Sequence, residues 1–294
     1  MKRSLFFIIA SAGFILSFNV AAASAIIPSV ANTFRVDDFC AGKIVWLYML
    51  PYGLAALLYG PLARSLDFKR ILFSCIGIFS LANLLSGLAP SLYALFAART
   101  LAGIAGAAII PLSLILIAKT SSSSERGKKV GGFFSLTFTS SLLGLFLSGL
   151  IPWRWIFLLP AIGAALVCLG IYLYFPDISL VKEKVKFNYL QALSDRRVLR
   201  LFLYIFSISF FYHGVRQWLG VYFSKIYGLE QFLVSMLLIT IHLSGILGES
   251  LGGVLADRVG RIRIVNIGVV LMLVALFSLL FQNILIVLFA IMFI

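Results

Sequence analysis

The sequence predicts an all-α membrane protein that crosses the bilayer many times. Of its 294 residues, 62% are apolar and only 12% are charged, whereas a soluble domain has about 25% charged residues. Apolar stretches of about 20 residues recur along the chain with short polar breaks between them, and a helix needs about 20 residues to cross roughly 30 Å of hydrocarbon. We therefore expect lipid, rather than water, to surround most of the surface.

Nine complete transmembrane helices and the beginning of a tenth are predicted. The longest polar segment inside the chain, residues 176–200, separates six of these spans from the rest and is typical of a cytoplasmic linker. We expect a six-helix half over residues 1–175 and an incomplete second half over residues 201–294. The predicted spans cover residues 5–25, 44–62, 71–89, 93–117, 130–151, 155–175, 201–223, 231–254 and 264–281, and the tenth begins at residue 284.

The first apolar stretch has a second interpretation. Lys2 and Arg3 precede it and a cluster of small residues follows at 21–25, which is also the pattern of a cleavable signal peptide. Eight spans would remain in that case. We favour a first transmembrane helix, because the rest of the chain requires its equivalent.

The basic residues predict the orientation in the membrane. If the N-terminus is cytoplasmic, 18 of the 24 lysines and arginines lie in inside segments, four lie in outside loops and two lie within spans. This asymmetry follows the positive-inside rule. We expect a multi-pass protein of the inner (plasma) membrane, whose basic loops contact anionic lipid headgroups.

Several classes of protein are excluded by the same residues. The net charge of +14 is spread over loops, whereas a nucleic-acid surface gathers its basic residues on one soluble face. The three cysteines, Cys40, Cys75 and Cys168, have no CxxC or metal-ligand spacing. The chain also has no Ser/His/Asp set and no phosphate-binding loop. We expect no nucleic-acid partner, no metal, no cofactor and no enzymatic activity.

One short motif occurs twice, each time between the second and third helix of a half. Residues 253–263 read GVLADRVGRIR and residues 60–70 read GPLARSLDFKR, with their first glycines 193 residues apart. Such self-similarity indicates an internal repeat. The two halves are therefore expected to be related copies.

The later copy resembles the GxLADRxGR loop of the major facilitator superfamily, and the earlier one is a worn copy with Arg64 in place of the aspartate. The resemblance covers essentially the whole chain and implies two six-helix bundles with a substrate site at the midplane between them. A glycine allows helices to approach closely, and an aspartate accepts hydrogen bonds at a helix N-terminus. These residues either form a gating latch or only orient a tight turn: Gly253, Asp257, Arg258, Gly260, Arg261, Gly60, Lys69 and Arg70.

Three further stretches resemble this family, the first its proton-coupled members and the other two its efflux branch. LFAARTLAGIAG at 95–106 resembles an RxxxGxxG motif, GLFLSG at 144–149 takes the place of GPxxGG, and WRWIF follows at 153–157. The helix-five motif keeps Gly144 and Gly149, while a leucine and a serine replace its proline and one glycine. The resemblance implies a proton-coupled antiporter that exports a drug or metabolite.

Polar residues inside the spans are candidates for the substrate or proton site, because a charge near the bilayer centre costs about 2.5–3.5 kcal/mol. Arg99 lies roughly 9 Å deep at about 1.5 Å per residue, so it either serves as a cationic site or extends to the outer headgroups. Asn19 stands nine residues before Pro28, where many efflux relatives carry an aspartate. Asparagine does not titrate, so Asn19 is left to bind Arg99 or a substrate.

Two later spans contain the remaining candidates. His213, Arg216 and Gln217 fall within two turns, with i+3 and i+4 spacing, and Arg216 either binds substrate or reaches the outer water. His242 is followed at i+7 by Glu249, the one carboxylate placed within the hydrocarbon. Glu249 is expected to carry protons or to belong to the latch. The nearby glycines are expected to permit tight packing: Gly245, Gly248, Gly252 and Gly253. The aromatic residues of span seven either line a pocket or face lipid.

The chain is expected to stop inside its tenth span, because a twelve-helix relative would continue for roughly two and a half more. The leading hypothesis is a proton-linked efflux transporter of a small organic molecule. The alternative is a non-transporting remnant, or an interaction partner that needs another polypeptide to supply the missing helices. The residues do not identify the substrate.

Overall fold

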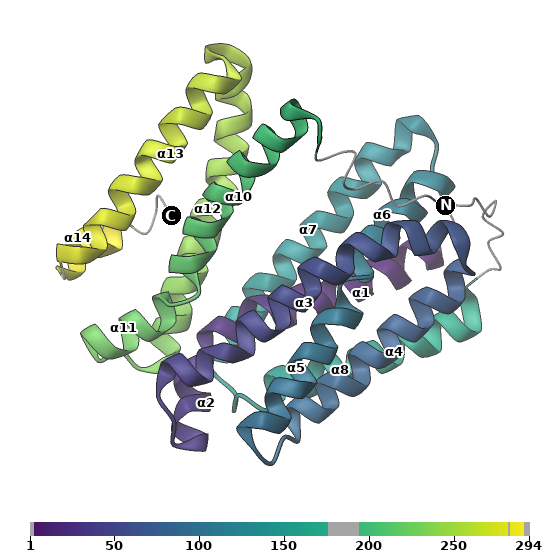
Figure 1. Ribbon diagram of the computed structural model, residues 1–294, viewed down its shortest axis with the longest axis horizontal. Coiled ribbons are helices and arrows are strands. Elements are labelled where there is room, and N and C mark those ends of the chain that lie inside the picture. Colours follow the sequence, from purple (N-terminus) through teal and green to yellow (C-terminus); the bar gives the residue numbers. More distant parts are fainter. Residues whose placement is uncertain (1–2, 176–193, 282, 291–294) are drawn as a thin grey trace. The chain divides into compact units, whose positions relative to one another are not determined.

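The computed structural model describes residues 3–175, 194–281 and 283–290 (Figure 1). Within these ranges the chain is helical and contains no strand. Nine helical segments in them are long and apolar enough to cross a membrane, so the prediction of nine spans is confirmed. These segments are Ser4–Ala25, Asp38–Ala63, Phe68–Gly87, Leu92–Thr120, Ser123–Ser148, Trp155–Tyr174, Arg196–Tyr227, Gln231–Gly248 and Ile262–Phe281.

The chain divides into two compact units, residues 1–187 and 188–294. In the first unit α1 packs against α7 and α8, α4 packs against α8 and α5, and α3 packs against α5. The helix that carried the signal-peptide alternative therefore packs against two later helices of the unit. The elements of this unit are α1 (Arg3–Ala25), α2 (Ile27–Phe34), α3 (Asp38–Ser65), α4 (Phe68–Gly87), α5 (Leu92–Gly106), α6 (Ile109–Thr120), α7 (Ser123–Ser148) and α8 (Trp155–Tyr174).

Short polar side chains fix where several of these helices begin. The Asp37 side chain accepts a hydrogen bond from the Cys40 amide at 2.7 Å and so caps α3. Ser91 caps α5 in the same way through the Ala94 amide, at 3.2 Å. A side-chain oxygen at the N-cap satisfies one of the amides that the first turn leaves without a partner. These caps separate apolar stretches that hydropathy alone does not delimit.

In the second unit α11 packs against α12, and α12 packs against α13. An aspartate again marks the first helix, because Asp195 accepts a hydrogen bond of 2.7 Å from the Arg197 amide. The elements are α10 (Arg196–Arg216), α11 (Leu219–Tyr227), α12 (Gln231–Val259), α13 (Arg261–Ser278), the 3₁₀ turn η1 (Leu279–Phe281) and α14 (Ile284–Ala290).

The internal repeat inferred from one loop extends to every α-helix of the second unit. Helices α10 to α14 begin 192 or 193 residues after helices α1 to α5, respectively. The same spacing relates the two positive-φ residues that end α2 and α11, Arg35 (φ 53°) and Gly228 (φ 63°). It also relates the N-caps of α4 and α13, Asp67 and Gly260. Helices α10 to α14 thus repeat the spacing of α1 to α5, with different residues at equivalent positions.

Two predicted spans are interrupted. The span at 93–117 is divided into α5 and α6 at Ala107 and Ala108, because the ring of Pro111 clashes with the carbonyl of Ala107 four residues earlier. The span at 201–223 is divided as well, since α10 ends at Arg216 and the separate helix α11, the counterpart of α2, begins at Leu219.

Candidate functional site

A buried polar network in the first unit is centred on Arg99 of α5. The Arg99 side chain is only 1% exposed. Its Nη1 donates a hydrogen bond of 2.7 Å to Asn19 Oδ1 on α1, and its Nε donates one of 3.2 Å to the carbonyl oxygen of Ile44 on α3. The alternative that Arg99 extends to the outer headgroups is wrong, because neighbouring helices enclose the guanidinium.

Asn19 connects Arg99 to a second buried amide. Asn19 Nδ2 donates a hydrogen bond of 2.8 Å to Asn83 Oδ1 on α4, and Asn83 Nδ2 donates one of 2.8 Å to the carbonyl of Phe79. The bond to Arg99 is one of the two roles that the sequence left open for Asn19. Sequence analysis missed Asn83, although a lone asparagine inside an apolar span was a signal that pointed to it.

Two aromatic rings cover the guanidinium. Its Cζ lies 4.3 Å from the centroid of the Tyr48 ring on α3 and 5.1 Å from that of Phe157 on α8. Cation–π contacts of desolvated groups contribute about 2 kcal/mol or more. Across the described residues, the ion pair that the structure shows is Lys129 with Glu125, at 2.7 Å. One amide, one carbonyl and two rings therefore hold Arg99, and no described carboxylate does.

Close helix contacts at two glycines allow this network to form. A Cβ at Gly103 would lie 2.2 Å from the carbonyl oxygen of Tyr48, and one at Gly144 would lie 2.6 Å from the carbonyl oxygen of Phe18, the residue before Asn19. Gly144, predicted as part of the helix-five motif, thus lets α7 approach α1 beside the network. Gly149, the other motif glycine, is the C-cap of α7.

A second polar group, here called the Arg216 cluster, lies in the second unit and comprises Tyr212, His213, Arg216 and His242. Arg216 is the last residue of α10 and is half-buried. Its Nη1 donates to the Tyr212 hydroxyl one turn earlier, and its Nη2 contacts Nδ1 of His242 on α12. The His213 ring packs edge-on against the Tyr212 ring, with centroids 4.9 Å apart.

The partners of Arg216 differ from those that the spacing indicated. The sequence grouped Arg216 with His213 and Gln217 on one helix, whereas its hydrogen bonds go to Tyr212 and to the neighbouring helix. Gln217 is the C-cap of α10. Its backbone N–H donates a hydrogen bond of 3.1 Å to the backbone carbonyl of His213. His242 and Glu249 were placed seven residues apart on one span, and the side chain of Glu249 lies outside the described residues.

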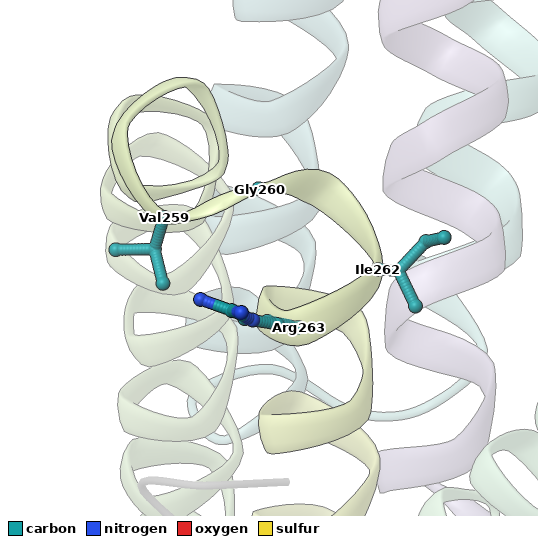
Figure 2. Close-up of a pocket in the computed structure, with 4 residues that line it drawn as sticks. All are labelled: Val259, Gly260, Ile262 and Arg263. Atoms are coloured by element: carbon teal, nitrogen blue, oxygen red, sulfur yellow. The ribbon is translucent and has the colours of Figure 1, made fainter.

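The later copy of the loop motif forms the turn between α12 and α13. Gly260 begins α13 with φ at 104°, a conformation that side chains with a Cβ rarely adopt. A surface depression here is lined by Val259, Gly260, Ile262 and Arg263. In Figure 2 the Arg263 side chain extends toward Val259, and the Ile262 side chain points in the opposite direction. Arg258 is exposed, and the surroundings of Gly253 and the side chains of Asp257 and Arg261 lie outside the described residues.

The earlier copy begins its helix by a different device. Asp67 accepts a hydrogen bond of 2.9 Å from the amide of Arg70 and caps α4. The Arg70 side chain is exposed and that of Lys69 is half-buried. A Cβ at Gly60 would meet no atom within 4 Å. The close helix approach expected at Gly60 is therefore absent within its unit.

The glycines of α12 likewise do not pack tightly within the second unit. A Cβ at Gly245, Gly248 or Gly252 would meet no atom within 4 Å, so the prediction of tight packing there is wrong for this unit. The reason is that α12 packs against α11 and α13 through other residues.

Residues of the WRWIF stretch tie several helices of the first unit together. Trp153 Nε1 donates a hydrogen bond of 2.9 Å to the Thr33 hydroxyl at the end of α2. Arg154 Nη1 donates to the carbonyls of Gly87 and Ala89, at 2.9 and 3.0 Å, where α4 ends. The Arg154 guanidinium also lies 4.5 Å from the Trp153 ring. Arg154 therefore caps α4 from the start of α8.

Comparison with known proteins gives consistent matches. The sequence profile of the Major Facilitator Superfamily matches residues 9–294. Azole resistance protein 1 of Saccharomyces cerevisiae is 32% identical over 179 residues, which are 58% of this chain and 28% of that protein. Puromycin resistance protein pur8 of Streptomyces alboniger is 34% identical over 149 residues, or 49% of this chain and 30% of that protein. The chain thus spans less than a third of the length of either relative.

The fold has a counterpart among solved structures. A bacterial homologue of the human lysosomal transporter Spinster, crystallised in an inward-facing and unoccupied conformation, aligns with 100% of this chain and 72% of its own, with a TM-score of 0.78. The sequences are 15% identical, so this similarity concerns the fold.

Proposed function

Because the chain belongs to the Major Facilitator Superfamily, we propose that it is a secondary active transporter that exports a small organic molecule by alternating access, coupled to protons. The observation that carries this proposal is the match of the family profile over residues 9–294, in a chain with nine membrane-spanning helical segments among its described residues. Alternating access in such folds is the movement of one half against the other around a midplane site.

Export is supported by the names of two relatives and by sequence marks. The matched proteins from yeast and Streptomyces are named for resistance to azoles and to puromycin, and resistance by a membrane transporter is export of the toxic compound. Gly144, Gly149 and the WRWIF stretch resemble the efflux branch in the same region of the chain. The proposed location is the plasma membrane, with the N-terminus in the cytoplasm.

Arg99 is proposed to hold the first unit together during transport. It contacts α1, α3 and α8 from α5, so movement of any of these helices changes its surroundings. Its partner Asn19 does not titrate, which leaves proton carriage to another group. We assign that role to Glu249, the one carboxylate in the predicted spans, because a carboxyl group in apolar surroundings can exchange protons at neutral pH.

The transport experiment uses proteoliposomes that contain the full chain and an imposed pH gradient, with labelled puromycin and fluconazole as probes. We expect accumulation that collapses when a protonophore is added. Arg99→Ala should lower the initial rate at least tenfold, while Lys119→Ala, which removes an exposed charge from the end of α6, should not. Glu249→Gln should abolish accumulation against a gradient but retain downhill exchange.

Two outcomes would contradict the proposal. Equal transport with the gradient dissipated would rule out proton coupling, and absence of transport by a folded chain would rule out a transporter that acts alone. The predicted complementing polypeptide is tested in the same assay. If it exists, a protein that co-purifies with the chain should restore accumulation when it is added back.

A further inference from the structure

Arg216 has a set of partners that leaves its charge unbalanced. Its guanidinium donates to the Tyr212 hydroxyl and contacts Nδ1 of His242. Nδ1 accepts a hydrogen bond only when the imidazole is neutral with its proton on the other nitrogen. Both partners are then neutral, and none of the described carboxylates pairs with Arg216. These hydrogen bonds satisfy two N–H groups without compensating the positive charge.

The sequence offers little negative charge at this depth. Of the ten acidic residues in the chain, Glu249 is the one within a predicted span. It lies seven residues beyond His242 on α12, which is about 10 Å along the helix axis at 1.5 Å per residue. Four potentially cationic side chains lie in the predicted spans: Arg99, His213, Arg216 and His242. Apart from Glu249, the predicted spans offer no carboxylate to complement this group, and an anionic ligand would supply that charge.

The two intramembrane arginines differ in whether an anionic ligand can reach the guanidinium. Arg99 is 1% exposed and is enclosed by contacts from α1, α3 and α8, so it has no room for a ligand. Arg216 is half-buried at the end of α10, and the adjacent side chain of His213 is exposed. A guanidinium presents five donors in a planar fork that matches an oxyanion, and Tyr212 adds a hydroxyl that can donate as well as accept.

Aromatic rings lie on the same helix, where Phe210 and Phe206 stand three and seven residues before His213 and so on its side of α10. Phe210 and Phe211 are 64% and 56% exposed, and Phe206 is 54% exposed one turn earlier. Phe206 and Phe210 stack with ring centroids 6.1 Å apart. A cluster that holds a cation and has exposed aromatic rings on the same helix is suited to a molecule with an anionic head and an apolar body.

We propose that the Arg216 cluster binds the oxyanion group of a soluble lipophilic organic anion, such as an aromatic carboxylate, and that this makes such anions one class of substrate of the transporter. The inference rests on the proposed transport function for its biological meaning, but the binding itself does not. A phospholipid headgroup shares the oxyanion chemistry, so the test has to separate a soluble anion from lipid.

The experiment measures binding to the full chain in nanodiscs of phosphatidylcholine by isothermal titration calorimetry. Three probes of similar size are compared: benzoate, benzyl alcohol and benzylammonium. We expect benzoate to bind at least tenfold more tightly than the other two. Arg216→Gln should weaken benzoate binding at least tenfold, His242→Gln about threefold, and Arg216→Lys should fall between, since it keeps the charge but not the fork.

The matched control is Arg200→Gln, which removes the same charge from an exposed position on the same helix and should leave benzoate affinity unchanged. Circular dichroism of each variant checks that the helices are retained. Equal affinity for the three probes, or an equal loss with Arg200→Gln, would overturn the proposal.

A second arm replaces part of the lipid with phosphatidylglycerol. Unchanged benzoate affinity supports a soluble ligand. Loss of benzoate binding, together with phosphatidylglycerol that co-purifies with the wild type but not with Arg216→Gln, would identify a headgroup site and overturn the soluble-anion proposal. If benzoate fails to bind while the chain still transports puromycin, the inference falls and the proposed function stands. If benzoate binds but the chain transports nothing, the proposed function falls and the binding site stands.

Discussion

The two units of this chain repeat one backbone course with different chemistry at equivalent positions. Asn19 on α1 and Tyr212 on α10 are 193 residues apart in sequence, and each bonds an intramembrane arginine. In the first unit the arginine is buried and bonded to residues on two other helices. In the second unit it is half-buried, with a tyrosine of its own helix and a histidine of α12 as partners.

Under the two proposals above, intramembrane charges serve two purposes. A charge whose donors are satisfied by buried amides of several helices holds those helices in register. A charge that keeps neutral partners and access to the exterior is available to a ligand. The surroundings of the arginine, rather than its depth in a span, decide between them, and substitutions at paired positions test this view.

The largest difference is expected at Asn19 and Tyr212. Asn19→Leu removes the acceptor of a buried guanidinium and leaves Asn83 without its donor, so it should lower the free energy of unfolding by about 3 kcal/mol. Tyr212→Phe removes one hydroxyl from a half-buried site and should cost less than about 1 kcal/mol. Unfolding by added SDS in mixed micelles, followed by circular dichroism, measures both. Equal costs would show that the two arginines play the same part.

The next effect concerns the glycines close to the arginines. Gly103→Ala places a Cβ against the Tyr48 carbonyl, at 2.2 Å before relaxation, and should cost about 2 kcal/mol through overpacking. Gly214 on α10 has no atom within 4 Å of its Cβ position. Gly214→Ala should therefore stabilise its helix by up to about 1 kcal/mol. The same SDS titration applies, and a stabilising Gly103→Ala would contradict the close contact.

The two copies of the loop provide a third pair. Gly260→Ala forces an L side chain into φ near 104° and should cost about 1–2 kcal/mol in backbone strain. Asp67→Ala removes a side-chain cap and should cost about 1 kcal/mol. Gly60→Ala, which introduces neither effect, is the control. Thermal unfolding in detergent ranks the three variants. If Gly260→Ala is as stable as Gly60→Ala, the positive φ at residue 260 does not strain a residue with a Cβ.

The smallest effect is a reciprocal exchange at the ends of α2 and α11. Arg35 holds a left-handed conformation that Gly228 adopts at the equivalent place, and such a conformation costs residues with a Cβ roughly 1 kcal/mol. Arg35→Gly should therefore raise the free energy of unfolding by about 0.5–1 kcal/mol, and Gly228→Arg should lower it by about 1 kcal/mol. If the free energy of unfolding changes in the same direction in both variants, side-chain contacts rather than the backbone conformation determine the effect.

Much of the fold was predictable, because hydropathy dominates where helices cross lipid. The nine spans followed from apolar length, and the spacing of 193 residues that one motif indicated extends to helices α10 to α14. The break between α5 and α6 needed attention to Pro111, whose effect on the carbonyl four residues earlier is local. The separation of α1 from α2 had a comparable signal in Pro28, which lies in the first turn of α2 and cannot continue the preceding helix.

The site was predictable only where polar residues are scarce. Asn19 and Arg99 stood out in apolar spans, and their hydrogen bond was among the expected possibilities. The contact between Arg216 and His242 was missed because helix spacing relates residues three or four apart, whereas this pair is 26 residues apart on two helices. Likewise, Gly103 shows its role only once α3 is known to lie against it.

The hydrogen bonds of the Trp153 and Arg154 side chains have a consequence for how fast the helix ends that they join unfold locally. One end of α2, the turn after α4 and the start of α8 are joined by three hydrogen bonds from two adjacent side chains. Segments that share their bonds open together. The amide hydrogens of these three segments should therefore exchange with solvent deuterium in one concerted event, at a common rate, although the first and last of them are 120 residues apart in the chain.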